Sequence, residues 1–278
     1  MPHSARQAQG RTKRLVWLTD LHLNFLAPAR VRGFLQGVAN TGVDAVLLGG
    51  DVAESRDLIS QLELIDDCLR RPVFFVLGNH DFYFGSVRRV SQEVQCFCDE
   101  HPRWTWLSRR DDVLELTARV GLVGHDGWAD GRLGDYRRSL VMMNDYKLIE
   151  ELAGYDKMGR WGVLKSMGDE SADHLRRVLP RAVDRYKEVF VLTHVPPFRE
   201  ACWYDGRISD DEWLPHFTCK AAGDAILDVM RSHPERRLTV LCGHTHSPGE
   251  AWPLPNVHVL TGGATYGAPQ IQRVFDLA

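Results

Sequence analysis

The sequence has 278 residues, of which 44% are hydrophobic and 26% are charged, a balance typical of a globular protein and not of a disordered chain. Its formal net charge of -3 shows no basic surplus, so a large surface for nucleic acids or anionic membranes is not expected. A single catalytic α/β domain covering residues 1–278 fits this length.

Cysteine usage and the N-terminus indicate the compartment. The six cysteines are scattered and form no Cys-x-x-Cys pair, which favours reduced structural thiols in a cytoplasmic protein over a disulfide framework. Residues 1–14 are polar and basic, so we expect a disordered tail there and not a secretory signal. No later run is long enough to span a bilayer.

The first third of the chain predicts alternating strands and helices. Short apolar runs at 15–19, 45–48 and 73–77 each end in polar residues and precede a helix-compatible stretch. Runs that are apolar on both faces are typical of strands in a sheet covered by helices. Because ligands of such sheets bind beyond the carboxyl ends of the strands, the polar residues there mark the expected site.

The pattern changes after Trp104. Runs at 113–116 and 120–123 predict a hairpin or adjacent strands of a second sheet, which indicates layered sheets. A helix is expected around 171–186, and further strands at 189–193, 238–242, 257–260 and 271–275. Two irregular segments, 127–168 and 196–218, are interpreted as insertions near the site.

Five short motifs follow the apolar runs in order. They are Asp20-Leu21-His22, Gly50-Asp51, Gly78-Asn79-His80-Asp81, Thr193-His194 and Gly243-His244-Thr245-His246. Each motif alone is commonly structural, since a lone histidine usually makes a hydrogen bond and Gly-Asp usually forms a turn. Together they place carboxylates, an amide and several imidazoles at strand ends that converge, which a purely structural origin explains poorly.

The donor atoms of these motifs indicate the kind of metal. They are oxygens and nitrogens without an obligatory thiolate, a set typical of sites for manganese, iron or zinc. Glycines beside Asp51, Asn79 and His244 let the backbone bend tightly toward one point. In Asp-x-His and His-x-His, the alternation of an extended chain directs both side chains to the same side. The sequence therefore predicts a metal centre.

The ordered motifs resemble the calcineurin-like metallophosphoesterase family, and the resemblance spans Asp20 to His246. It implies an α/β fold with a layered α-β-β-α sandwich of two mixed sheets flanked by helices. It also implies two divalent metal ions. By analogy, Asp20, His22 and His246 would hold one ion, Asn79, His194 and His244 would hold the second, and Asp51 would bridge both.

The resemblance also implies a reaction. Two cations would activate a water as metal-bound hydroxide and neutralise charge on the phosphoryl oxygens of a phosphoester. His80 is the candidate general acid for the leaving oxygen, and Asp81 would orient its imidazole or keep it protonated. The alternative is that His80 only hydrogen-bonds behind the metal ligands.

Two departures narrow the type of enzyme. Purple acid phosphatases have a tyrosine ligand three residues beyond the bridging aspartate, where this chain has Glu54, and a glycine where it has His22. Serine/threonine protein phosphatases have an arginine-bearing sequence after the Asn-His motif, where residues 82–85 are Phe-Tyr-Phe-Gly. A phosphodiesterase acting on a small molecule is therefore favoured over a phosphomonoesterase or a phosphoprotein phosphatase.

Substrate binding is predicted for His125, Arg199 and Tyr204, which offer an imidazole, a cation and a flat ring. An ordinary polar loop around His125 and solvated positions for the other two are the alternatives. A nuclease of the same family and a non-catalytic metal-binding scaffold also remain open. The net charge disfavours the first, and the complete ligand set disfavours the second. The residues do not indicate the physiological substrate, the metal or the oligomeric state.

Overall fold

The computed structural model describes residues 14–277. The predicted N-terminal tail, residues 1–14, lies outside the described residues except for Arg14, which begins the first strand. Within the described part of the chain, no helix combines the length and the apolar character needed to cross a membrane.

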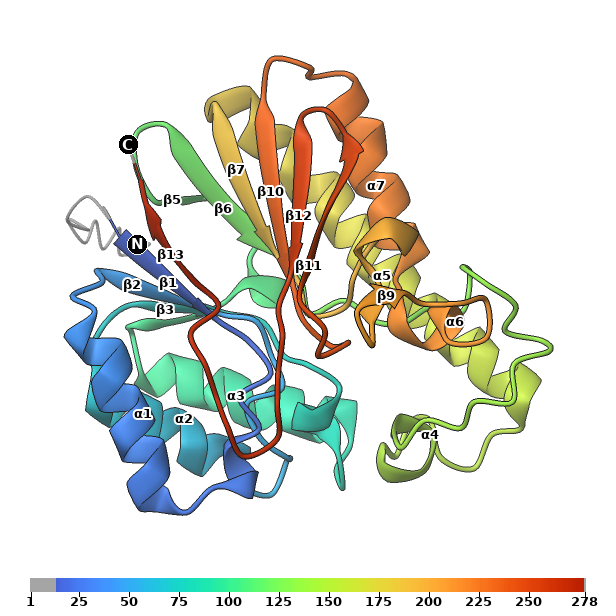
Figure 1. Ribbon diagram of the computed structural model, residues 1–278, viewed down its shortest axis with the longest axis horizontal. Coiled ribbons are helices and arrows are strands. Elements are labelled where there is room, and N and C mark those ends of the chain that lie inside the picture. The colour runs from blue at the N-terminus through green and yellow to red at the C-terminus, as the bar shows by residue number, and fades with distance from the viewer. Residues whose placement is uncertain (1–13, 278) are drawn as a thin grey trace, which may run out of the picture.

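The first sheet contains five strands in the order β13-β1-β2-β3-β4. Their bounds are β1 Arg14–Leu18, β2 Ala45–Leu48, β3 Val73–Phe75, β4 Trp104–Trp106 and β13 Arg273–Asp276. β1 to β4 run parallel, and β13 returns antiparallel to β1. Three helices connect the parallel strands and cover the outer face of the sheet (Figure 1): α1 Pro28–Asn40, α2 Leu58–Leu69 and α3 Val87–Glu100.

The second sheet contains six strands in the order β11-β12-β10-β7-β6-β5. Their bounds are β5 Leu114–Glu115, β6 Val120–Gly124, β7 Glu188–Leu192, β10 Arg237–Cys242, β11 Gly249–Leu254 and β12 Val257–Thr261. The four inner strands run parallel and both edge strands pair antiparallel. The predicted hairpin is β5–β6. Helices α5 (Lys157–Arg185) and α7 (Lys220–Arg231) cover the outer face (Figure 1).

The alternation of apolar side chains explains the layers. In β1, Val16 and Leu18 pack toward the helices of the first sheet, whereas Leu15 and Trp17 pack between the two sheets. Burying one such side chain stabilises the fold by about 1.5–3 kcal/mol. Both faces of the inner strands are therefore apolar, and the predicted α-β-β-α sandwich of two mixed sheets is confirmed.

Short elements make up the two irregular segments and several strand-to-helix connections. They are η1 Leu23–Phe25, η2 His80–Phe82, η3 Leu107–Arg109, α4 Asp145–Leu148, η4 Arg199–Ala201, β8 Trp203–Tyr204, β9 Arg207–Ile208 and α6 Leu214–Phe217. The segment 127–168 is less irregular than expected at its end, because α5 already begins at Lys157. Asp156 caps this helix by accepting a hydrogen bond from the Gly159 N–H at 2.7 Å.

Candidate metal centre and active site

The seven predicted metal ligands lie on loops that follow the carboxyl ends of β1, β2, β3, β7 and β10. They are Asp20, His22, Asp51, Asn79, His194, His244 and His246. The first four come from the first sheet and the last three from the second. Because the two sheets pack face to face, these loops meet at one rim of the sandwich (Figure 1). The fold therefore brings together side chains that are more than 200 residues apart in the sequence.

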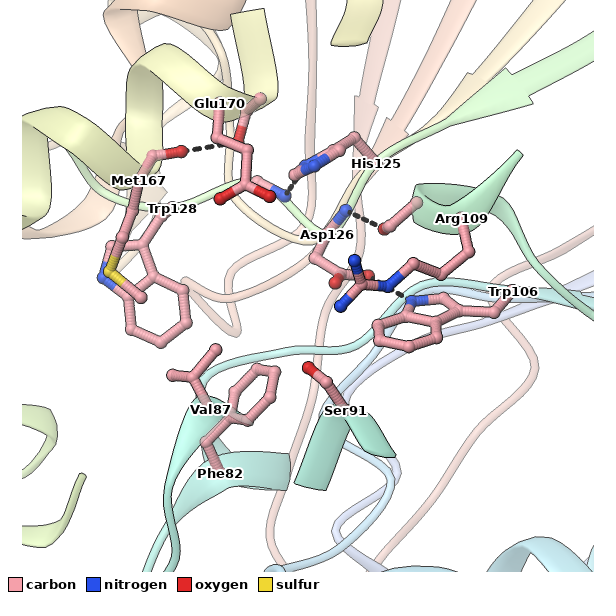
Figure 2. Close-up of a pocket in the computed structure, with 13 residues that line it drawn as sticks. Phe82, Val87, Ser91, Trp106, Arg109, His125, Asp126, Trp128, Met167 and Glu170 are labelled. Atoms are coloured by element: carbon pink, nitrogen blue, oxygen red, sulfur yellow. Dashed lines mark hydrogen bonds between the residues drawn. The ribbon is translucent and has the colours of Figure 1, made fainter. Parts of the chain in front are cut away.

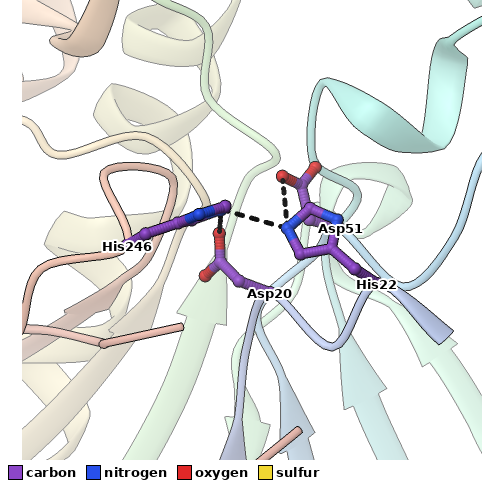
Figure 3. A group of neighbouring side chains, drawn as sticks. All are labelled: Asp20, His22, Asp51 and His246. Atoms are coloured by element: carbon purple, nitrogen blue, oxygen red, sulfur yellow. Dashed lines mark hydrogen bonds and ion pairs between the residues drawn. The ribbon is translucent and has the colours of Figure 1, made fainter. Parts of the chain in front are cut away.

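One cluster contains Asp20, His22, Asp51 and His246 (Figure 3). One ligand atom from each side chain lies within 4.8 Å of the others. His22 Nε2 is 3.0 Å from His246 Nε2 and 3.7 Å from Asp51 Oδ2, and His246 Nε2 is 3.5 Å from Asp20 Oδ1. Asp20, His22 and Asp51 are almost fully buried, so these donors form a compact site that can hold a cation.

A second cluster shares Asp51. The Asn79 Oδ1 atom is 3.2 Å from His194 Nε2 and 2.9 Å from His244 Nδ1. His194 Nε2 is also 3.4 Å from Asp51 Oδ1. The two oxygens of Asp51 therefore face different clusters, Oδ2 toward His22 and Oδ1 toward His194. The Asp51 carboxylate therefore lies between the two groups of donors.

In the second cluster, each imidazole forms a hydrogen bond through the nitrogen that points away from Asn79. These hydrogen bonds determine whether the inner nitrogens can bind a metal. His194 Nδ1 lies 2.8 Å from the Gly49 carbonyl oxygen, and His244 Nε2 lies 3.2 Å from the His216 carbonyl oxygen. These nitrogens donate, so in neutral rings, the form that binds a metal, His194 Nε2 and His244 Nδ1 are acceptors. Both then face the Asn79 Oδ1 atom, so three lone pairs converge. A divalent cation satisfies this arrangement.

The orientation of the Asn79 amide is fixed by its other end. Its Nδ2 atom donates to the Tyr83 hydroxyl at 3.2 Å and to Asp145 Oδ2 at 3.3 Å. The Tyr83 hydroxyl donates to the same Asp145 oxygen at 2.8 Å. Asp145 is buried and lies in α4, within the segment 127–168. A residue of the segment 127–168 thus orients the amide of a predicted ligand.

The charges of the site favour metal binding. Burial acts to raise the pKa of Asp51, but the neighbouring His194 and His80 outweigh it and hold that pKa well below its usual range. Burial lowers the pKa of His22 and of His244 to about 4, so both imidazoles are neutral at pH 7. Although burial opposes it, Asp51 raises the pKa of His194 to about 10. The site therefore attracts positive charge, which a proton provides when no cation is bound.

The backbone is strained at most of the ligands. Among the described residues other than glycine, eight have a positive φ, and five of these are predicted ligands. The five are Asp20, His22, Asp51, His244 and His246. This conformation costs about 1–2 kcal/mol per residue, and such strain is concentrated at functional sites. Close approach adds a constraint, because a side-chain carbon on Gly78 would collide with Asp51 Oδ1.

His80 lies beside the metal ligands. Its ring stacks on Tyr83 with a centroid distance of 4.1 Å and meets the His22 ring edge-on at 4.6 Å. Its backbone N–H donates to Asp51 Oδ1 at 2.8 Å. Within the described residues its buried Nδ1 atom has no hydrogen-bond partner. The ring is therefore held by stacking and not by a hydrogen bond to its Nδ1 atom.

Asp81 does not form the contact with the His80 imidazole that the sequence suggested. Its buried carboxylate accepts hydrogen bonds from the backbone N–H groups of Asp51, Val52, Ala53 and Gly78, at 2.8–3.1 Å. No hydrogen bond between this carboxylate and the His80 ring is found among residues 14–277. Asp81 ties the loop that carries Asp51 to the loop that carries Asn79, so it positions ligands instead of orienting the candidate acid.

A cavity of about 390 Å³ opens beside the metal ligands. Its lining includes Asn79, His80, His244 and His246 together with Tyr204, one of the three predicted substrate-binding residues. Tyr266 also lines it, with its ring 4.6 Å from His22 and 5.1 Å from His246. Tyr266 is not among the residues predicted from the sequence. It could have been found from its position, because it lies in the loop that follows the carboxyl end of β12.

The other two predicted substrate-binding residues lie elsewhere. The Arg199 guanidinium forms an ion pair with Asp211 at 2.8 Å. His125 lines a separate pocket with Arg109 and Asp126 (Figure 2). Asp126 ties this pocket to the metal centre, because its carbonyl oxygen accepts from the His194 N–H at 2.9 Å. His125 thus belongs to a loop that supports the site and does not line the cavity beside the ligands.

The chain is similar to known proteins in two ways, through a family model that matches its sequence and through solved structures that share its fold. A family model described as calcineurin-like phosphoesterase matches residues 13–248. The structure of a phosphopantetheinyl hydrolase from Mycobacterium tuberculosis is similar with a TM-score of 0.62 and 18% identity, over 91% of this chain and 90% of that chain. A dimetal phosphatase from Danio rerio is similar with a TM-score of 0.57 and 16% identity, over 91% and 88%. These two likenesses show a shared fold. No curated protein matches the sequence significantly.

Proposed function

The chain belongs to the calcineurin-like phosphoesterases, and from this premise we propose that it is a phosphodiesterase that uses two divalent metal ions. The observation that carries the proposal is the sharing of Asp51 by two clusters of oxygen and nitrogen donors. The other six predicted ligands complete the clusters. In the second cluster, hydrogen bonds to the outer sides of Asn79, His194 and His244 direct their acceptor atoms toward a common point.

The ligands divide between the ions by proximity. Asp20, His22 and His246 would hold one ion, Asn79, His194 and His244 would hold the other, and Asp51 would contact both. The mixed nitrogen and oxygen set suits manganese, iron or zinc. When bound, such ions polarise phosphoryl oxygens and ease the deprotonation of water.

His80 would protonate the leaving oxygen. Its ring lines the cavity in which the leaving group would lie, and its position is fixed by the Tyr83 ring and by the hydrogen bond from its backbone to Asp51. A proton delivered from this position stabilises the departing alkoxide as the P–O bond breaks. His80 is therefore the general acid of the proposed reaction.

The charge of the cavity supports a diester over a monoester. Its lining, as far as the described residues go, includes neither lysine nor arginine. A monoester carries a second negative charge that protein cations commonly neutralise, whereas a diester carries one. A small diester also suits the net charge of -3 better than nucleic acid does.

A cytoplasmic location is part of the proposal, supported by six unpaired cysteines.

Hydrolysis of two aryl esters tests the proposal. Manganese-loaded protein should hydrolyse bis(p-nitrophenyl) phosphate with a higher kcat/KM than p-nitrophenyl phosphate. Treatment with a chelator should abolish both activities, and manganese should restore them. Metal-loaded protein that hydrolyses neither ester would point to a binding scaffold, and a preference for the monoester would remove the diesterase assignment.

A further inference from the structure

One side of the cavity is an aromatic wall formed by Tyr204, Trp213 and Phe217. The Tyr204 and Trp213 rings are 5.5 Å apart at 22°, and the Trp213 and Phe217 rings are 5.3 Å apart at 24°. The Phe217 ring meets the His244 ring edge-on at 5.4 Å. The aromatic wall therefore runs from a metal ligand outward, and all three of its residues line the cavity.

The rest of the lining leaves apolar surface open to solvent. Met142 is 55% exposed and Tyr266 is 50% exposed, and both line the cavity. Large exposed apolar groups gathered around a concave site indicate a ligand that covers them. Methionine side chains adapt to ligands of different outline. The cavity is thus suited to an apolar group attached to the phosphate.

Charge and hydrogen bonding narrow the nature of that group. The described lining residues include no Lys, Arg, Asp or Glu, so an additional ionised group on the substrate would lack the charged side chains that usually compensate its desolvation. The lining nevertheless contains the exposed Asn144 amide, which can donate and accept hydrogen bonds. A ring with neutral heteroatoms can both cover the apolar surface of the cavity and form a hydrogen bond with its polar lining. An aliphatic chain can only cover the apolar surface.

We propose that the group esterified to the phosphate is a flat, uncharged aromatic or heteroaromatic ring that stacks on the aromatic wall. This inference rests on the proposed phosphoesterase function and names its substrate class. The parallel rings of Tyr204 and Trp213 favour flat partners because offset stacking adds attraction beyond the area that is buried. Phosphoesters with further phosphates or carboxylates are poor substrates.

Calorimetric binding of two phosphonates to manganese-loaded protein tests the inference. Benzylphosphonate and cyclohexylmethylphosphonate have the same charged head and similar size, but only the first has a flat ring. We expect benzylphosphonate to bind about threefold to tenfold more tightly, the worth of one aromatic stacking contact. Binding is measured without turnover, so a protein that binds both phosphonates but hydrolyses no ester would contradict the proposed function alone.

Variants of the aromatic wall assign the preference to a residue. Trp213→Leu should reduce the affinity ratio of the two phosphonates about threefold to tenfold, whereas Trp213→Phe should retain most of it. Trp252→Leu is the matched control, because Trp252 is 59% exposed on β11 and stacks on His258. Equal affinities in the wild type, or a ratio that Trp213→Leu leaves unchanged in protein with normal metal content and unfolding temperature, would overturn the inference.

Discussion

The direction of the Asn79 amide depends on Asp145. Without the carboxylate, nothing distinguishes the amide oxygen from the nitrogen at the metal centre, and the wrong face would present hydrogens to His194 and His244. Asp145 accepts from both Asn79 and Tyr83, so it also fixes the ring on which His80 stacks. A residue outside the sequence motifs therefore controls two parts of the site.

Asp145→Asn should lower metal affinity or turnover about 10–100-fold, the usual effect of losing a partner behind a metal ligand. Steady-state kinetics at several manganese concentrations measures both. Glu150→Gln is the control, because Glu150 is exposed in the same segment. Wild-type kinetics in Asp145→Asn would show that Asn79 needs no support.

His80→Asn should lower turnover about 10²–10⁴-fold for a diester with an alkyl leaving group, because general acid catalysis is lost. The loss should be much smaller for a p-nitrophenolate leaving group, which departs without a proton. Metal content should stay near that of the wild type. An equal loss for both leaving groups would assign His80 to positioning instead of proton transfer.

The sequence locates the side chains that the fold gathers at one rim of the sandwich, but not the contacts that support them. The motifs identify Asp20, Asp51 and His244 because ligands follow strand ends at short, regular spacings. The contact between Asn79 and Asp145 joins positions 66 residues apart, and no local pattern reports such a pair. The Asp81 carboxylate was assigned to His80 by adjacency, whereas the fold directs it to backbone N–H groups.

Helix α2 is joined to β4 by Asp66. Its carboxylate accepts from the Arg103 side chain at 2.5 and 3.2 Å and from Trp104 Nε1 at 2.9 Å. Burial acts to raise the pKa of Asp66, but the bonds from Arg103 and Trp104 outweigh it and lower that pKa. The ionised form thus stabilises the fold, and this link holds a helix of the outer layer to the edge of the first sheet.

Asp66→Asn should lower the free energy of unfolding by about 1 kcal/mol at pH 7, a discounted value because the Arg103 side chain is 46% exposed. A carboxylate whose pKa is lower in the folded protein than in the unfolded chain contributes its full stabilising free energy above the unfolded pKa of about 3.9. This contribution is lost as the pH falls through the folded pKa. Urea unfolding at pH 7 and pH 3 should therefore show a difference that shrinks in acid. Asp67→Asn, at an exposed neighbour, should change little. A difference that is constant with pH would contradict the link.

Elements with strong apolar runs were predictable, whereas others, among them β11 and the first turns of α5, were not. Strand β11 contains Gly249 and Pro253, which are unfavourable in a strand, but it lies at the edge of the second sheet, where proline is tolerated. The first turns of α5 contain Gly159 and Gly162, which lower helix propensity. In both places tertiary packing decides the structure and local propensity does not.

The predicted metal ligands come from both sheets, so we expect metal binding and folding to be coupled. Asp20, Asp51 and Asn79 follow strands of the first sheet, while His194 and His244 follow strands of the second. A cation would bind the packed sandwich and not the separated layers. The site is thus a property of the whole molecule, although each motif that supplies it is local.

Manganese should raise the unfolding temperature of chelator-treated protein in a concentration-dependent manner. Ligands that bind only the folded state stabilise it by mass action, by about 2.7 kcal/mol at 100 times their Kd. Differential scanning calorimetry measures the shift. Calcium at the same concentration should shift it less, since the imidazole donors suit transition metals. An unfolding temperature independent of manganese would mean that no cation bridges the layers.

Asp51 is the residue on which the two clusters depend, and its substitution by asparagine tests the centre most directly. We expect two manganese ions per wild-type chain by elemental analysis, with hydrolysis of bis(p-nitrophenyl) phosphate. In Asp51→Asn, metal content and hydrolysis should fall together, because a neutral amide lacks the negative charge with which the carboxylate would attract both cations. Full metal content with wild-type hydrolysis in the Asp51→Asn protein would contradict the shared dinuclear site.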